Sequence, residues 1–255
     1  MADSRIHRLD LTRAQRISRV VIRGYARWLT LLRCSVEVEG LEQLPDSGSV
    51  LLAVRHVHHI YDAATLLATL PRDLHFLVAL DWVHTRRERQ LLERACQLAV
   101  WPTLLRTDRL PANPDPATAI WQPHEIEAST RRSVSESVNL LVAGRALVVF
   151  PEGAPVIDPE RPRRASDALL PFQHGFVTIA RLAARITGQP IPVVPVGLSY
   201  AGADRPTRTT MGFGAPRAWW QVRMRLGAPV LVNADASRGA TARAVQDAVR
   251  TLSGL

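Results

Sequence analysis

Leu147-Val148-Val149-Phe150-Pro151-Glu152-Gly153 is the stretch of this sequence that decides the fold. Four apolar residues in a row, two of them β-branched, predict a buried strand. Proline cannot continue the hydrogen-bond ladder and glycine permits a sharp turn, so the strand ends with Glu152 at its C-terminal mouth. Ligands bind at such mouths in open α/β sheets. Alone, the motif more often marks an ordinary strand exit with a solvated glutamate, so its functional interpretation depends on a second cluster.

That second cluster follows another apolar strand, residues 50–54, and reads Arg55-His56-Val57-His58-His59-Ile60-Tyr61-Asp62. A histidine at a strand end can act as a general base when a carboxylate orients it and stabilises the imidazolium. His58 lies four residues before Asp62 and would share a helix face with it. His56 lies six residues before Asp62 and could reach it only across a non-helical turn. The sequence leaves both histidines open as the base.

A metal site is the competing interpretation of the same cluster. His56-x-His58 at a strand end has the ligand spacing of several zinc hydrolases. The further ligands of such enzymes are not evident, because the surroundings of His84, His124 and His174 are unremarkable. A metal-dependent hydrolase therefore stays an alternative. The chain contains no Gly-x-Ser-x-Gly motif, and a phosphate-binding loop is excluded because the chain has no lysine.

Composition narrows the class of protein. The chain has 255 residues, is 47% hydrophobic and carries a net charge of +9, all of its basic side chains being arginines. A GC-rich genome is the simplest cause of such a composition. The functional interpretation is attraction to polyanions, namely nucleic acid, anionic lipid or a phosphorylated substrate. No apolar run is long enough to predict a membrane-spanning helix, and residues 1–16 lack the apolar segment of a signal peptide. Cys34 and Cys96 have neither metal-ligand nor Cys-x-x-Cys spacing, so free structural thiols are expected. We expect a cytosolic or membrane-surface protein.

Strands and helices alternate along the rest of the chain, which predicts an α/β fold: a mostly parallel central sheet flanked by helices. The predicted strands are residues 35–38, 50–54, 75–80, 100–105, 147–150, 191–198 and 219–226. The predicted helices are residues 12–32, 62–70, 86–98, 129–143, 175–186 and 239–252. Proline-rich or polar loops are predicted over residues 110–123, 154–171 and 201–216.

The first predicted helix, residues 12–32, is amphipathic and basic. A basic stripe is expected from arginines three or four residues apart, namely Arg13, Arg16, Arg19, Arg23 and Arg27. Apolar residues lie largely elsewhere on the helical wheel, namely Ile17, Val20, Val21, Trp28, Leu31 and Leu32. This pattern is typical of an interfacial membrane anchor, and equally of a surface helix packed on its own domain. No nucleic-acid-binding motif accompanies the arginines, so no nucleic acid partner is expected.

Together, these motifs resemble the glycerolipid acyltransferases, of which the lysophosphatidic acid acyltransferases are the best known. Four blocks carry the resemblance, in order along the chain: the cluster of His56, His58 and Asp62; Trp101-Pro102-Thr103-Leu104-Leu105-Arg106; Phe150-Pro151-Glu152-Gly153; and Val193-Val194-Pro195-Val196-Gly197. Phe172-Gln173-His174-Gly175-Phe176 is similar to the family's entry to a helix. The resemblance divides the chain into an N-terminal amphipathic segment, residues 1–34, and an acyltransferase-like α/β domain, residues 35–255.

The resemblance implies an O-acyltransferase of phospholipid biosynthesis. A histidine oriented by Asp62 would deprotonate an acceptor hydroxyl, which would attack the thioester of acyl-CoA or acyl-carrier protein. The acceptor would be a lysophospholipid such as 1-acyl-glycerol-3-phosphate, or a related lipid alcohol. Arg106 would bind its phosphate, and Glu152 with Gly153 would shape its site. Neither a metal nor a further cofactor is expected. The predicted partners are the thioester donor, a lipid acceptor and, through the N-terminal helix, the cytoplasmic face of a membrane, with the protein peripheral or monotopic.

Two departures from the family pattern bear on these roles. The family has four residues between its histidine and its aspartate. Counted back from Asp62, that histidine position falls on Val57, so His56 stands one position before it and His58 one position after it. Arg55 stands where the family has asparagine. Ala154 and Pro155 replace a hydroxyl residue and an arginine that often follow the third block, and Arg161, Arg163 and Arg164 are the nearby arginines that could compensate. A catalytically inactive lipid-binding relative is therefore the third hypothesis.

Overall fold

The structure is a computed structural model that describes residues 11–106, 120–157, 168–201 and 220–255. The predicted loop arginines Arg161, Arg163 and Arg164 lie outside the described residues. At the centre is a mixed sheet with the strand order β1-β8-β7-β2-β6-β3 and with β9 paired to β7. Its strands are β1 (Cys34–Glu39), β2 (Val50–Val54), β3 (Leu74–Phe76), β6 (Ala146–Val149), β7 (Ile191–Ala201), β8 (Trp220–Leu226) and β9 (Val230–Val232).

The middle of the sheet is parallel, as predicted. Strands β7, β2, β6 and β3 run in the same direction, while β8 and β9 pair antiparallel to β7, and β1 pairs parallel to β8. Every residue of β2 and β6 is buried. This explains why the sequences of these strands are continuous apolar runs and do not alternate between apolar and polar residues. The fold class predicted from the sequence, a mostly parallel sheet flanked by helices, is confirmed.

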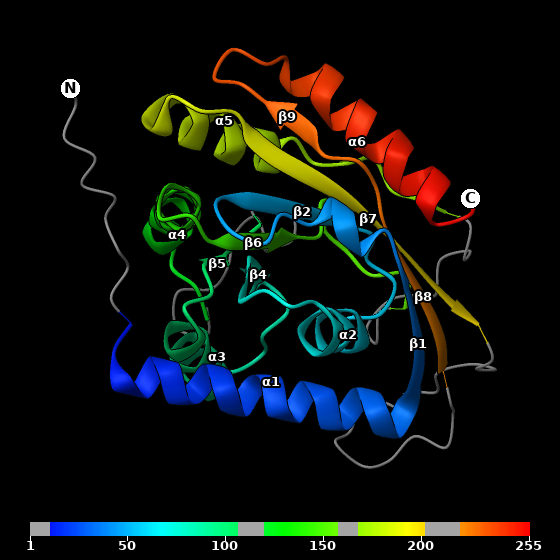
Figure 1. Ribbon diagram of the computed structural model, residues 1–255. Helices are drawn as coiled ribbons and strands as arrows, with labels where there is room; N and C mark the ends of the chain where they lie inside the picture. The colour runs from blue at the N-terminus through cyan, green and yellow to red at the C-terminus, as the bar shows by residue number, and fades with distance from the viewer. Residues whose placement is uncertain (1–10, 107–119, 158–167, 202–219) are drawn as a thin grey trace.

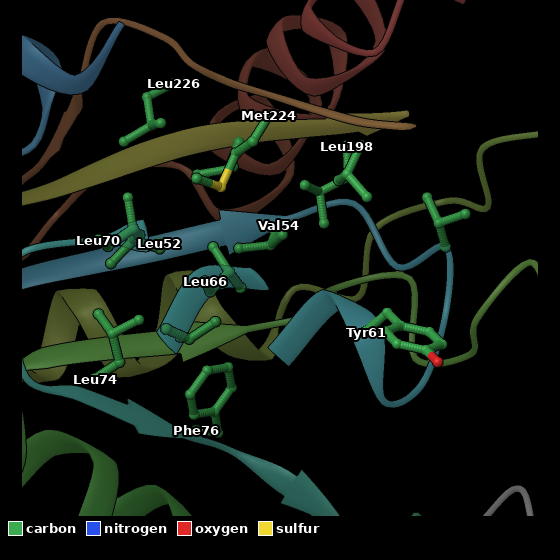
Figure 2. Packing of buried hydrophobic residues seen from close by; sticks show 14 of the residues in the cluster. Leu52, Val54, Tyr61, Leu66, Leu70, Leu74, Phe76, Leu198, Met224 and Leu226 are labelled. Carbon is green, nitrogen blue, oxygen red and sulfur yellow. The ribbon is translucent and has the colours of Figure 1, made fainter. Parts of the chain in front are cut away.

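Helices cover both faces of the sheet (Figure 1). One face packs against α1 (Arg13–Arg33) and α2 (Tyr61–Thr69), and the other against α4 (Pro123–Val142), α5 (Gly175–Thr187) and α6 (Arg238–Leu252). Alternate residues of β2 divide between the two cores: Leu52 points towards α2, and Leu51 points towards α5. Figure 2 shows the first core, where α2 side chains such as Leu66 meet residues of β2, β7 and β8.

Some predicted boundaries are corrected by the structure. The predicted strand 75–80 is split into β3 and the short β4 (Val78–Ala79), and within the described residues β4 pairs with β5 (Thr103–Leu104) and not with the main sheet. These two short strands connect through α3 (Arg86–Ala99) and form a separate ladder beside the main sheet. Helix α4 begins at Pro123, six residues earlier than predicted, because proline is tolerated in the first turn of a helix. A three-residue helical turn, η1 (Leu41–Gln43), and strand β9 were not predicted.

Helix α1 lies along one side of the molecule, below the sheet in Figure 1. It begins with a capping box between Thr12 and Gln15, and it passes directly into β1 at Cys34. Arg19 and Arg23 of the predicted basic stripe point inward: Arg19 pairs with Asp73 at 3.1 Å, and Arg23 donates to the Leu70 carbonyl at 2.5 Å. The stripe is therefore not one solvent-facing surface.

The outward side of α1 is apolar instead. We call this surface the exposed apolar stripe, and it comprises Ile17, Val20, Val21, Tyr25, Trp28, Leu31 and Leu32. Val20 is 73% exposed, Trp28 56% and Leu31 75%, which is unusual for large apolar side chains at helical spacing. No helix in the described part of the chain is both long and apolar enough to span a bilayer.

Candidate active site

The two motif-bearing strands end side by side. β2 and β6 are parallel neighbours whose last paired residues are Ala53 and Val149, so His56 and Phe150 leave the sheet at the same edge. Their rings stack with centroids 4.2 Å apart and planes 21° apart. The segments that follow stay together, because Val156 donates its amide to the His56 carbonyl at 2.9 Å. The sheet thus brings the first and third sequence blocks into one site.

His56 contacts Asp62 across the turn between β2 and α2. The distance from His56 Nδ1 to Asp62 Oδ2 is 2.8 Å, and Oδ2 also accepts the amides of Val57 at 2.7 Å and His58 at 2.9 Å. Asp62 is fully buried in the first turn of α2, where the helix dipole favours a carboxylate. The additional residue in the motif is accommodated by this turn, so the unusual spacing still permits the contact.

The ring orientation of His56 fixes which nitrogen is available for chemistry. A carboxylate only accepts hydrogen bonds, so Nδ1 carries the proton and Nε2 carries the lone pair. Among the described residues, no hydrogen bond to Nε2 is found, and the His56 side chain is 14% exposed. The pair can therefore accept a proton at Nε2 while Asp62 stabilises the imidazolium that forms.

His58 has a different environment. It is 2% exposed, and its Nδ1 accepts the amides of Ile60 at 3.2 Å and Tyr61 at 3.4 Å. Burial, followed by the neighbouring His59 charge, lowers the pKa of His58 to about 4, so the ring is neutral at neutral pH. Its ring stacks on His59 at 4.7 Å. The Nδ1 atom of His56 therefore contacts Asp62, whereas the Nδ1 atom of His58 accepts backbone amides. Within the described residues, no group of three or more side chains is arranged to bind a metal ion.

Tyr200 is a site residue that sequence reasoning missed. Its hydroxyl donates to Asp62 Oδ1 at 2.7 Å, on the carboxylate oxygen opposite to the one that His56 contacts. Burial and then the Asp62 charge raise the pKa of the Tyr200 phenol well above its ordinary value, so the hydroxyl stays protonated and remains a donor. The predicted strand stopped at Leu198, and no local motif marks Tyr200, because its contact depends on the pairing of β7 with β2.

Glu152 lies inside the site rather than in solvent. It is 3% exposed, and its carboxylate accepts the backbone amides of His56 at 2.8 Å and Leu170 at 3.2 Å. Gly153 follows in the left-handed region, at φ 72°, and its amide donates to the Phe150 carbonyl. Through the hydrogen bond from the His56 amide to Glu152, the Pro-Glu-Gly turn holds the backbone of His56 beside the end of β6.

Arg106 reaches the same turn from β5. Its Nη2 contacts Asp81 Oδ2 at 2.6 Å and its Nε contacts Asp81 Oδ1 at 3.0 Å. Asp81 is another residue that sequence reasoning missed. A side chain on Gly153 would place its Cβ 3.2 Å from Arg106 Nη1, so the third guanidinium nitrogen lies against the Gly153 turn. The structure thus brings together all six predicted site residues, with Arg106 paired to a carboxylate.

The fold and this site define an α/β enzyme domain with a histidine–aspartate pair at the C-terminal mouth of a parallel sheet. The sequence profile of the family described as Acyltransferase matches residues 35–199. The chain belongs to this acyltransferase family, and the resemblance found in the sequence is confirmed. No curated protein matches the chain.

The fold also matches a solved structure, the crystal structure of the 1-acyl-sn-glycerophosphate (LPA) acyltransferase, PlsC, from Thermotoga maritima. The TM-score is 0.58 at 17% sequence identity, and the match covers 93% of this chain and 78% of the other. At this identity the likeness concerns the fold. It extends over nearly the whole chain, including regions outside the part matched by the family profile.

Proposed function

We propose that this acyltransferase is an O-acyltransferase that moves a fatty acyl group from acyl-CoA or acyl-carrier protein to a lysophospholipid. The observation that carries the proposal is the contact between His56 Nδ1 and Asp62 Oδ2 at 2.8 Å, which leaves Nε2 as the basic nitrogen. We assign the role of general base to His56 rather than His58, because His58 is buried and its Nδ1 is occupied by backbone amides.

In the proposed reaction, His56 Nε2 takes the proton of the acceptor hydroxyl while that oxygen attacks the thioester carbonyl. The tetrahedral intermediate collapses, the carbon–sulfur bond breaks, and the imidazolium returns the proton to the departing thiolate. An ester and a free thiol result, and no covalent enzyme intermediate is formed. Burial raises the pKa of Cys34 to about 12 and that of Cys96 to about 11, which disfavours either cysteine as a nucleophile.

Arg106 is the proposed contact for the acceptor's phosphate. A guanidinium binds phosphate oxygens with charge-assisted hydrogen bonds, and Asp81 holds this one by Nε and Nη2. The remaining nitrogen, Nη1, lies beside the Gly153 turn, on the side of the strand ends that hold His56. 1-acyl-glycerol-3-phosphate is therefore the first acceptor to test, followed by lysophospholipids with larger headgroups.

We further propose that the exposed apolar stripe of α1 binds the membrane that supplies the acceptor. Interfacial helices insert apolar and tryptophan side chains to the level of the acyl chains, while flanking arginines contact anionic headgroups. Exposed Arg13, Arg16 and Arg27 accompany the stripe. The inward positions of Arg19 and Arg23, whose ends contact the domain itself, favour an outward apolar surface for lipid.

The catalytic proposal is tested by acceptor-dependent release of free thiol from acyl-CoA, and in parallel from acyl-carrier protein. We expect His56→Ala and Asp62→Asn to lower kcat at least about 100-fold, in line with the loss of general-base catalysis. His58→Gln serves as the matched histidine control and should retain turnover in whatever fraction folds. Full activity of His56→Ala would refute the assignment, and vesicle binding without turnover on any donor or acceptor would favour the inactive relative.

The membrane proposal is tested by flotation with vesicles that contain anionic lipid. Replacing Val20, Trp28 and Leu31 together by serine should abolish binding. The matched control replaces Ile186, near the end of α5, and Leu231, in the middle of β9, which are 63% and 64% exposed and lie outside the stripe. Equal binding by the two variants would show that the stripe is not the anchor.

A further inference from the structure

Asp62 is held from two sides. On one side, Oδ2 accepts His56 Nδ1 and the amides of Val57 and His58, all from the turn that follows β2. On the other side, Oδ1 accepts the hydroxyl of Tyr200, near the end of β7 and 138 residues away in sequence. A fully buried carboxylate needs donors on both oxygens, because an unsatisfied buried charge is costly. Tyr200 supplies the only side-chain donor to Oδ1 found among the described residues.

The location of Tyr200 makes this contact rigid. β7 and β2 are parallel neighbours paired from Leu51 to Val54, and Tyr200 itself pairs with Val222 of β8. Its ring meets Trp220 edge-to-face at 5.6 Å. The tyrosine hydroxyl is therefore held by the sheet, whereas His56 belongs to a turn with one residue more than the family spacing. The Tyr200 hydroxyl, which is fixed in the sheet, can therefore hold the Asp62 carboxylate in one orientation. The turn that carries His56 has more conformational freedom and would hold it less firmly.

We propose that Tyr200 is a positioning residue of the His56–Asp62 pair: it holds Oδ1 so that Oδ2 faces His56 Nδ1. This inference rests on the proposed role of His56 as the base. Without the Tyr200 hydroxyl the carboxylate is free to rotate, and the hydrogen bond between His56 Nδ1 and Oδ2 is weakened.

Other titratable groups also lie around the pair. They are Cys34 of β1, His58 and His59 of the turn, Tyr61 of α2, and Glu152, whose carboxylate accepts the His56 amide. The pKa of Cys34 is about 12 and that of His58 about 4, so neither changes charge near neutral pH. Tyr61 provides a matched control, because it is buried beside His58, and the hydroxyl donor that Asp62 contacts belongs to Tyr200.

The test compares Tyr200→Phe with Tyr61→Phe in the full chain. The hydrogen bond between His56 Nδ1 and Asp62 is followed through the ¹H and ¹⁵N chemical shifts of the His56 Nδ1–H group in ¹⁵N-histidine-labelled protein, with His56→Ala assigning the resonance, so this readout needs no substrate. We expect Tyr200→Phe to shift or broaden this resonance and Tyr61→Phe to leave it unchanged. An unchanged Nδ1–H resonance in folded Tyr200→Phe would overturn the inference.

Kinetics provide the second readout. Tyr200→Phe should lower kcat about 10-fold with little change in KM. In an Asp62→Asn background the same substitution should add no further loss, because Tyr200 acts through Asp62. Additive losses would contradict the inference. An active His56→Ala would instead refute the proposed function, so the two failures are distinguishable.

Discussion

Gly153 shows at the residue scale how one backbone position serves the site. Its φ of 72° allows the turn that places Glu152 under the His56 amide, and its missing side chain leaves room for Arg106. An alanine here would be strained in the left-handed region by about 1 kcal/mol and would also press on the guanidinium. The two effects can be separated by comparison with another glycine.

We predict that Gly153→Ala lowers the free energy of unfolding by about 1 kcal/mol and raises KM for a phosphate-bearing acceptor several-fold. Gly188→Ala is the matched control, because Gly188 has a φ of 67° at the end of α5 with no atom within 4 Å of an added Cβ. It should lose similar stability with unchanged KM. Denaturant unfolding measures the stability of the two variants, and titration with the acceptor measures their KM. An equal KM in the two variants would contradict the role assigned to Arg106.

The sequence could predict some of these residues and not others, for a physical reason. His56, Asp62, Glu152 and Gly153 lie at the ends of two recognisable strands, and parallel strands present their carboxyl ends at one edge. The choice between His56 and His58 needed the turn itself, because both can reach Asp62 in principle. Tyr200 and Asp81 had no local signal, since each is defined by a partner distant in sequence.

At the scale of elements, long and strongly patterned segments were predictable and short ones were not. The buried strands β2 and β6 and the helices α1 and α6 have clear periodicity or uninterrupted apolar runs. β4 and β5 have two residues each, and their pairing apart from the main sheet depends on where α3 packs. β9 is held mainly by its ladder with β7, and a three-residue segment carries no usable period.

Val100, at the end of α3, leads to an element-scale prediction. It is the one non-glycine residue with positive φ in the described part of the chain, at 59°, and its carbonyl contacts His75 Nδ1 at 2.8 Å. Glycine is usually about 1 kcal/mol less stable than alanine in a helix. Here we expect Val100→Gly to be about 1 kcal/mol more stable than Val100→Ala, because only glycine avoids the left-handed strain. Chemical denaturation measures the free energy of unfolding of both variants. If Val100→Ala were the more stable of the two, the left-handed strain at this position would be absent.

At the scale of the whole molecule, two buried histidines set a pH dependence of stability. Burial is the largest cause that lowers the pKa of both His58 and His75 from 6.5 to about 4. Below pH 6.5 the unfolded chain binds protons at these positions and the folded protein does not. Stability is therefore full above that pH and is lost as the pH falls towards 4.

We predict a loss of about 2 kcal/mol for each of these histidines between pH 7 and pH 5. Urea unfolding at the two pH values measures it. The variant His75→Gln should remove about half of this pH dependence. A stability that stays flat over the same range would mean that the two rings are protonated inside the fold.

The continuity of α1 with β1 has a consequence for the proposed binding of α1 to a membrane. The helix ends at Arg33 and the strand begins at Cys34, with no linker between them, and β1 belongs to the same sheet as β2, whose C-terminal end leads into the His56 turn. In the proposed membrane-bound state, the tilt and depth of α1 in the bilayer surface would also set the tilt and depth of the sheet, because the two would move as one rigid body. The height of the reacting atoms above the acyl chains would then follow the lateral packing of the lipids, and the rate of transfer would respond to membrane curvature as well as to lipid chemistry.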